Sequence, residues 1–232
     1  MPTLLPSQMQ SKLMACLSGS LWERLVDGSI RNLVTTRIEF TDGAISHKRN
    51  IANIFAPYCR VIGVSAFQSY RAISYVYFPS VTAVGTNAFS DCRNLHSISL
   101  PTCSLIGPGA FYNCFFLSRV SFEQCESIYS QTFANCDQLR SVNVPSCSII
   151  SDYAFANDRA LTNIVAPNCK ILGLGAFYNC QRLSADTYFP ICQEIHTYTF
   201  ANCQQLRYLN FPECTVVRNG AFAFCSNIVS MY

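Results

Sequence analysis

The most regular feature of the chain is a phenylalanine that recurs at steps of 22 residues, with one step of 23. An aliphatic residue lies five positions before each of these phenylalanines, and a proline lies ten positions before seven of them. The phenylalanines are Phe67, Phe89, Phe111, Phe133, Phe155, Phe177, Phe200 and Phe222. A fixed period of this length is typical of proteins built from stacked repeats. We call one repeat a rung.

A second pattern lies between each phenylalanine and the next proline. It is Leu-x-x-Ile-x-Leu-Pro-x-Cys, for example Leu95, Ile98, Leu100, Pro101 and Cys103. Because side chains of a strand alternate between its two faces, this pattern predicts a short strand whose Leu and Ile side chains point into a stacked core. Together with the Ile-Gly-x-x-Ala-Phe-x-x-Cys half from Ile106 to Cys114, it resembles the BspA-type, or treponemal-type, leucine-rich repeat family.

The resemblance covers about residues 51 to 232 and implies a curved solenoid with a parallel sheet of short strands on one face. We therefore predict an α/β solenoid, a leucine-rich repeat stack of about eight to ten rungs of 22–23 residues. A stack exposes its core at both ends unless it is capped. Residues 1–50 are predicted to form an N-terminal cap, and residues 51–232 the solenoid.

The cap is predicted to contain an amphipathic helix over residues 7 to about 26 and a degenerate first rung. Ser7 and Gln10 form a capping box, and apolar residues follow at helical spacing. These are Met9, Leu13, Leu17, Leu21 and Leu25. The degenerate rung is expected to run through Ile30 and Leu33.

The C-terminal end of the sequence repeats the strand pattern from Ile228 to Tyr232 without a polar cap. The last rung is therefore expected to expose Phe222, Ile228 and Met231 unless another chain covers them. Exposed apolar patches of this kind mark interaction sites. We expect a homo-oligomer formed through this rung.

Composition narrows the classes of protein. Half of the residues are hydrophobic, 12% are charged and the formal net charge is +3, which favours a folded chain and gives no indication of a nucleic-acid partner. No apolar run reaches the roughly 20 residues of a membrane span. The first 25 residues do not have the form of a secretory signal, and no anchor is recognised. Cytosolic synthesis is expected, with display on a cell surface or a virion as a further expectation.

The fourteen cysteines follow the repeat: six lie three residues after the phenylalanine, seven lie two after the proline position, and Cys16 stands alone. No Cys-x-x-Cys occurs and only three histidines are present, so no metal site is predicted. Disulfides and a catalytic thiol were weighed against buried reduced thiols that fill tight turns and donate weakly to a carbonyl of the adjacent rung; we favour the latter. Neither catalytic residues nor a cofactor is predicted, and the chain is expected not to be an enzyme.

Function is expected on the strand positions that point out of the core. These change from rung to rung and are rich in Tyr, Ser, Asn and Arg, a composition that resembles a paratope, although any exposed strand face is polar. The predicted ligand-binding residues are Tyr75, Tyr77, His96, Arg119, Arg140, Asn143, Asn163, Tyr188, Arg207, Tyr208 and Asn210. The arginines among them favour an acidic glycan or an acidic protein patch.

Three functions remain open, of which one is an intracellular interaction scaffold that the sequence does not separate from the other two. The first is a non-enzymatic recognition or adhesion module that binds a protein or glycan through this face. The family resemblance implies adhesion to host or neighbouring cell surfaces. The second is a structural or receptor-binding component of a phage or prophage tail, or of another assembled particle.

Overall fold

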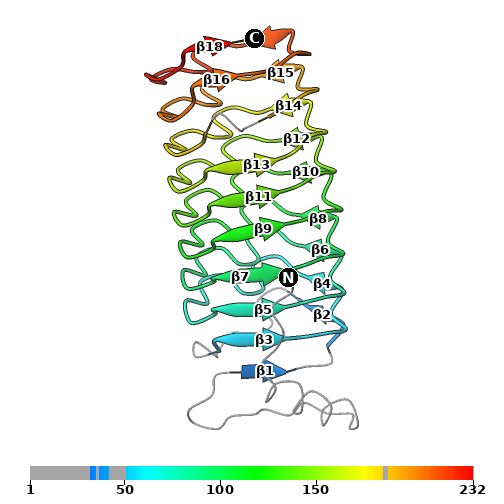
Figure 1. Cartoon of the computed structure of the whole chain (residues 1–232). Coiled ribbons are helices and arrows are strands. Elements are labelled where there is room, and N and C mark those ends of the chain that lie inside the picture. Colours follow the sequence, from blue (N-terminus) through cyan, green and yellow to red (C-terminus); the bar gives the residue numbers. More distant parts are fainter. Residues whose placement is uncertain (1–31, 35–36, 42–50, 185–187, 232) are drawn as a thin grey trace.

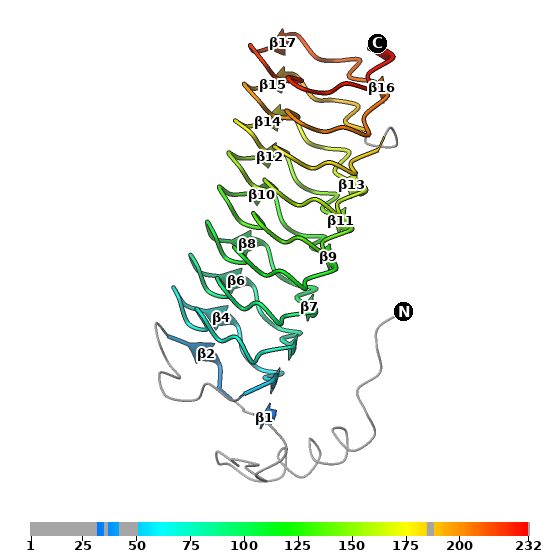
Figure 2. The same ribbon diagram turned by 90° about the vertical axis from the view of Figure 1, so that its left-hand side faces the viewer.

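The computed structural model describes residues 32–34, 37–41, 51–184 and 188–231. These residues form an elongated solenoid in which two stacks of short parallel strands run along the axis (Figure 1). A typical rung contributes one strand to each stack, and neighbouring strands pair in register within five sheets, three along one stack and two along the other. Seen from the side, successive rungs are offset evenly along the axis, and the strands of both stacks follow one another in sequence order (Figure 2).

Stack A contains the predicted Leu-x-x-Ile-x-Leu strands. Its members are β1 (Asn32–Val34), β3 (Asn53–Phe55), β5 (Tyr75–Tyr77), β7 (Ser97–Ser99), β9 (Arg119–Ser121), β11 (Ser141–Asn143), β13 (Asn163–Val165), β16 (Tyr208–Leu209) and β18 (Ser230–Met231). Between β13 and β16, Tyr188 continues the stack through a parallel bridge to Val165. The parallel sheet that the repeat predicted is confirmed.

Stack B was not predicted. It is formed by two-residue strands that contain the aliphatic residue five positions before each phenylalanine. They are β2 (Glu39–Phe40), β4 (Val61–Ile62), β6 (Ala83–Val84), β8 (Leu105–Ile106), β10 (Ser127–Ile128), β12 (Ile149–Ile150), β14 (Ile171–Leu172), β15 (Glu194–Ile195) and β17 (Val216–Val217). The inward residue of each of these strands is buried except in β17, at the C-terminal end.

The expected α/β class is wrong for the described rungs, because none of them contains a helix. The segment around each phenylalanine forms tight turns instead. In the rung of Phe89, the residues two before and two after it, Asn87 and Asp91, have φ values of 55° and 59°. A left-handed residue ends a right-handed helix, so two of them four positions apart leave no room for one. The predicted N-terminal helix at residues 7–26 lies outside the described residues.

The stack extends to the N-terminal side of residue 51. Strand β1 pairs with β3, aligning Leu33 with Ile54, and β2 pairs with β4, aligning Phe40 with Ile62. A rung through Leu33 is therefore present, as the degenerate pattern predicted. No helix in the described part of the chain is long and apolar enough to cross a membrane.

One continuous core runs the length of the solenoid. The repeat phenylalanines from Phe67 to Phe200 are completely buried, and their rings stack on one another with centroids 5.1–5.4 Å apart. Most of these neighbouring rings are within 7° of parallel. Each repeat phenylalanine N–H also donates to a carbonyl of the following rung, for example Phe133 to Ala154 at 2.8 Å. The period of 22 residues therefore places identical rings above one another.

Glycine allows the rungs to approach closely beside stack B. A Cβ atom on Gly85 would lie 2.6 Å from the carbonyl carbon of Gly63, and one on Gly107 would lie 2.6 Å from the backbone nitrogen of Thr86. Both distances are shorter than any ordinary contact, and both involve backbone atoms. Glycine is required there because two backbones meet.

Candidate binding face

The predicted binding residues all lie on stack A or within one residue of its strands. In β5 the side chains of Tyr75 and Tyr77 point outward while Val76 is buried. The same alternation places Arg119, Asn143, Asn163 and Tyr208 on the outer face, whereas His96, Arg140 and Arg207 each lie just before a strand and are exposed there. The exposed ones are Tyr75, Tyr77, His96, Arg119, Arg140, Tyr188, Arg207, Tyr208 and Asn210, whereas Asn143 and Asn163 are half-buried.

The N-terminal part of this face carries an aromatic cluster of five rings, Phe55, Tyr75, Tyr77, His96 and Phe116. The Tyr75 and His96 rings stack with centroids 5.9 Å apart, and His96 stacks on Phe116 at 5.4 Å. Tyr77 stacks on Phe55 of the preceding rung at 4.9 Å. Phe116 is exposed and was not among the predicted binding residues. It occupies a turn position that is polar in the neighbouring rungs, and this difference from its neighbours could have identified it from the sequence.

The central part of the face is polar. Arg119, Ser141 and Asn163 are aligned across β9, β11 and β13. The Nδ2 atom of Asn143 donates to Oγ of Ser121 at 3.0 Å. Asn143 and Ser121 therefore satisfy part of each other's hydrogen-bonding capacity across two neighbouring rungs.

Hydroxyl groups at the start of the stack A strands are engaged with the backbone. The side chains of Ser118, Thr162 and Ser184 each donate to a carbonyl one rung earlier, at 3.4, 3.0 and 3.2 Å. Such bonds connect neighbouring rungs. These small polar residues therefore have a structural role. Their presence does not require a ligand, because any exposed strand face is polar.

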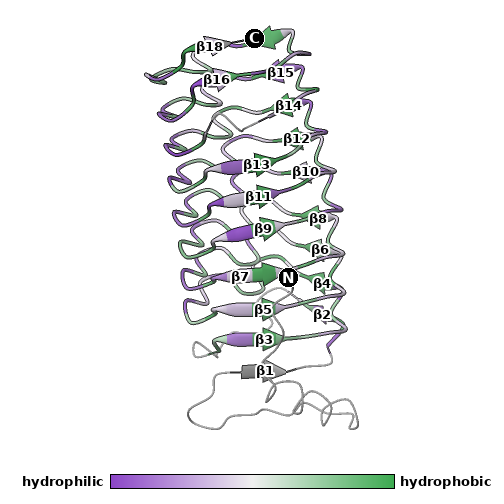
Figure 3. Ribbon diagram, in the orientation of Figure 1, coloured by the Kyte–Doolittle hydropathy of each residue, from purple (hydrophilic) through white to green (hydrophobic). Residues whose placement is uncertain are grey.

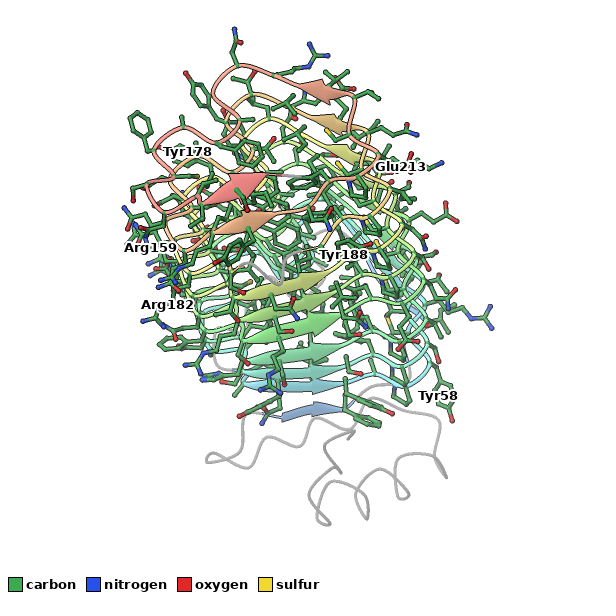
Figure 4. All side chains as sticks on the ribbon, turned by 45° about the horizontal axis from the view of Figure 1, so that its top comes forward. Tyr58, Arg159, Tyr178, Arg182, Tyr188 and Glu213 are labelled. Carbon is green, nitrogen blue, oxygen red and sulfur yellow. The ribbon has the colours of Figure 1, made fainter. Side chains whose placement is uncertain are left out.

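The tyrosines do not form a single patch. Tyr188 and Tyr208 lie at the C-terminal part of the face, and Tyr75 and Tyr77 at the N-terminal part (Figure 1). Six strand-to-strand steps separate β5 from β16, which at roughly 4.8 Å per step is about 29 Å. Figure 4 shows Tyr188 beside the stack A strands and far from Tyr58. A compact ligand would contact one pair of tyrosines only.

Stack B presents a second outward column, and this column is largely apolar (Figure 3). Val61, Leu105 and Ile149 are exposed there, each next to a buried aliphatic residue of the same strand. The predicted binding residues include none from stack B. A pair of adjacent aliphatic residues, which occurs in most repeats but not at Ser127 or Glu194, was the signal for this second face.

The described cysteines are free thiols, and they form two columns. Three residues after each phenylalanine, the thiol donates to the carbonyl of the preceding repeat phenylalanine, as Cys114 does to Phe89 at 3.2 Å and Cys180 to Phe155 at 3.1 Å. In the other column the thiol bonds within its own rung, as Cys103 does to Leu105 at 3.3 Å. The expected bond to an adjacent rung is therefore made mainly by the first column; in the second, Cys214 also donates to the Gln193 carbonyl of the preceding rung at 3.6 Å. Cys16 lies outside the described residues.

Burial makes these thiols unreactive. Desolvation raises the pKa of Cys59 to about 11 and the pKa of Cys103 to about 12. It raises the pKa of Cys114 and Cys136 further still. Since the thiolate is the nucleophile and the metal ligand, such thiols are poorly suited to catalysis or metal binding at neutral pH. No group of three or more His, Cys, Asp or Glu side chains that could hold a metal occurs among the described residues.

Asp158 replaces a cysteine in the column that follows the phenylalanines. It is completely buried, and its Oδ1 accepts a hydrogen bond from the Cys136 N–H at 2.7 Å. Its Oδ2 is buried without a hydrogen-bond partner. Burial raises the pKa of Asp158 well above its usual range.

Comparison with known proteins agrees with this architecture. Residues 39–162 and 148–232 match the model of the BspA type leucine rich repeat region, in six copies. A leucine-rich repeat protein from T. pallidum has a similar structure, with 22% identity, a TM-score of 0.61, and coverage of 66% of this chain and 78% of that one. A leucine-rich cell surface protein from Faecalibacterium prausnitzii is 22% identical with a TM-score of 0.49, and the match covers 82% of this chain and 62% of that one. No curated protein matches the chain.

The T. pallidum protein shares the fold, and the family model covers most of the chain beyond residue 38. The matched residues contain the repeat phenylalanines and the strands of both stacks from β2 onward. The chain belongs to the BspA-type leucine-rich repeat family.

Proposed function

We propose that the chain is a non-enzymatic recognition module that binds a protein or glycan through the outer face of stack A. The observation that carries the proposal is the exposure of four tyrosines on this face. Tyr75, Tyr77, Tyr188 and Tyr208 are 55%, 37%, 52% and 55% exposed. Interfaces are enriched in tyrosine because its ring gives a large contact area for little loss of side-chain entropy.

The scaffold supports this role. The strands beneath the tyrosines are held by in-register pairing and by a fully buried core, so the side chains are presented in fixed positions. A binding site that is ordered before the ligand arrives loses less entropy on binding. Family membership agrees with a binding function, since repeat solenoids commonly bind ligands on an extended face.

The experiment compares two double variants with a matched control on arrays of immobilised glycans and purified extracellular proteins. One variant is Tyr75→Ala with Tyr77→Ala, and the other is Tyr188→Ala with Tyr208→Ala. The control, Tyr58→Ala with Tyr129→Ala, removes two exposed tyrosines from outside stack A. We expect the wild-type chain to bind, one of the two double variants to lose at least tenfold in affinity, and the control to bind like the wild type.

The two tyrosine pairs are tested separately because about 29 Å lies between them. Circular dichroism and thermal melts of each variant confirm that the fold is retained. An array on which the wild-type chain binds nothing would contradict the proposal, as would equal losses in the control and in both double variants.

A second candidate, a component of an assembled particle, is favoured by one observation. In the 232-residue chain the C-terminal rung exposes Val217, Phe224 and Val229 at 51%, 80% and 69%. The residues equivalent to Val217 in the other rungs are buried. Contact between copies through this rung would cover these side chains, and the oligomeric state in solution tests this candidate.

A further inference from the structure

Seven consecutive rungs, from that of Phe67 to that of Phe200, each place one arginine between the phenylalanine turn and the first residue of the stack A strand. We call these residues the arginine row. They are Arg71, Arg93, Arg119, Arg140, Arg159, Arg182 and Arg207. All seven are exposed. Figure 4 shows Arg159 and Arg182 on the same side of the solenoid, with their side chains directed outward.

Three members of the row occupy the same position of the repeat, four residues after the phenylalanine. The N–H groups of Arg71, Arg93 and Arg159 each donate to the carbonyl two residues earlier at 2.9 Å, so the three side chains leave equivalent turns. The Arg140 carbonyl accepts the Thr162 N–H of the next rung at 3.0 Å. With roughly 4.8 Å between rungs, the row is about 29 Å long and carries one positive charge per rung.

Few acidic groups neutralise the row. Asp91 pairs with Arg93 at 3.3 Å, and Asp137 lies in a turn of the same side, whereas Asp158 is buried inside the core. The remaining six arginines form no ion pair with another described residue. The described acidic side chains elsewhere are Glu39, Glu123, Glu126, Asp152, Glu194 and Glu213. Positive charge is therefore concentrated on this one side.

We propose that the arginine row binds a linear anionic polysaccharide, one that carries sulfate or carboxylate groups, aligned with the solenoid axis. The inference rests on the proposed function, because it names a ligand class for the same side of the module. A guanidinium group makes paired hydrogen bonds to planar or tetrahedral oxyanions. A row with one such group per rung contacts a repeating polyanion at regular intervals, and the contacts add along the polymer.

Among the rings beside the row, those of His96 and Phe115 are covered by neighbouring side chains, which leaves fewer ring faces for the bases of a single-stranded nucleic acid. Proteins that bind single strands offer ring faces on which bases stack. Here the His96 ring lies between those of Tyr75 and Phe116, so both of its faces are covered. Phe115 is covered on one side by the Arg93 guanidinium, 5.3 Å from the ring centroid.

The experiment measures affinity for heparin, for neutral dextran and for oligothymidylate of equal charge, at several salt concentrations. The test variant is Arg140→Gln, Arg159→Gln and Arg182→Gln. The control, Arg60→Gln, Lys170→Gln and Arg218→Gln, removes the same number of positive charges from outside the row. Within the described part of the chain, Arg218 is the one member of these six that forms an ion pair, with Glu194.

We expect the wild-type chain to bind heparin and not dextran, with oligothymidylate bound at least tenfold more weakly. The test variant should lose at least tenfold in heparin affinity, and the control less than threefold. The slope of log affinity against log salt should fall by about 2 to 3 in the test variant, since each neutralised charge contributes about 0.7 to 0.9.

The inference is overturned if the wild-type chain does not bind heparin at low salt, if the control loses as much as the test variant, or if oligothymidylate binds more tightly. Its failure is distinguishable from that of the proposed function. A chain that ignores heparin but binds an arrayed ligand through either tyrosine pair refutes the arginine row alone. A chain that binds neither heparin nor any arrayed ligand refutes both.

Discussion

Asn135 donates a hydrogen bond from Nδ2 to Oδ1 of Asn113, one rung earlier, over 2.9 Å. Asn157 makes the same bond to Asn135 at 3.0 Å, and Asn179 makes it to Asn157 at 2.9 Å. The ladder extends from Asp91 to Asn202. Each of these residues also has a positive φ, which asparagine and aspartate tolerate better than most residues. The side chains of the ladder therefore form hydrogen bonds with one another at positions where the backbone turns.

Replacing Asn157 should test both roles of the ladder. Asn157→Gly removes two hydrogen bonds but keeps a backbone that accepts φ 66°. We expect a loss of about 1–3 kcal/mol in the free energy of unfolding. Asn157→Ala should lose about 1–2 kcal/mol more, because the methyl group is strained at positive φ. Urea denaturation measures both; a less stable Gly variant than Ala variant would contradict this account.

The phenylalanine column should dominate stability. Phe133 is completely buried between Phe111 and Phe155, and its truncation to alanine should cost about 3–5 kcal/mol. Phe222 is stacked on Phe200 on one side and is partly exposed, so Phe222→Ala should cost less. Denaturation midpoints of the two variants compare them directly. Equal losses would mean that stacking along the column contributes little.

Asp158 should make stability fall as the pH rises. A carboxyl group whose pKa is higher in the folded than in the unfolded chain holds its proton more tightly when folded. Its contribution is greatest below the ordinary pKa of 3.8 and decreases as the pH rises through the window above it. Asp158→Asn keeps an acceptor for the Cys136 N–H and removes the titration. We expect it to stabilise the protein by about 1–3 kcal/mol at pH 8 and by less at pH 4.

The measurement is the difference in unfolding free energy between wild type and Asp158→Asn at pH 4, 6 and 8. Over this range the buried thiols stay protonated, because burial raises the pKa of these cysteines above 9.0. A difference that is constant with pH would show that the pKa of Asp158 does not change on folding.

Thiol reactivity should follow burial. In the native protein a disulfide-exchange reagent is expected to label Cys214 and Cys225 first, since they are the described cysteines that are only partly buried. Under denaturing conditions the count should approach fourteen, the number in the sequence. A much lower count would indicate disulfides. Fast native labelling of Cys114 would show that the stack opens readily.

Self-association through the C-terminal rung stays a prediction. Phe224→Ser with Val229→Ser removes the two most exposed apolar side chains of that rung. We expect the wild-type 232-residue chain to be a defined oligomer by size-exclusion chromatography with light scattering, and this variant to dissociate. The control, Val64→Ser with Leu105→Ser, removes exposed apolar groups from elsewhere. A monomeric wild-type chain at high concentration would contradict the prediction.

The sequence by itself determined the repeat, the core and the strands of stack A. A constant period gives each residue the same neighbours in every rung, so Phe133, Leu139 and Val142 could be assigned to core columns by position alone. The same argument placed Tyr75 and Arg119 on the outer face, because side chains alternate along a strand. The period and the alternation depend on residues close together in the sequence, and they recur in every rung.

Only the tertiary structure decided what depends on backbone dihedrals and on contacts between rungs. The positive φ values of Asn87 and Asp91 make the segment around Phe89 a series of tight turns, and a hydropathy pattern gives no information about φ. The arginine row combines four different positions of the repeat, so the constant period does not by itself predict it. The distance between Tyr75 and Tyr208 followed in the same way from the rise per rung, because a face is assembled from residues that stacking, and not sequence proximity, brings together.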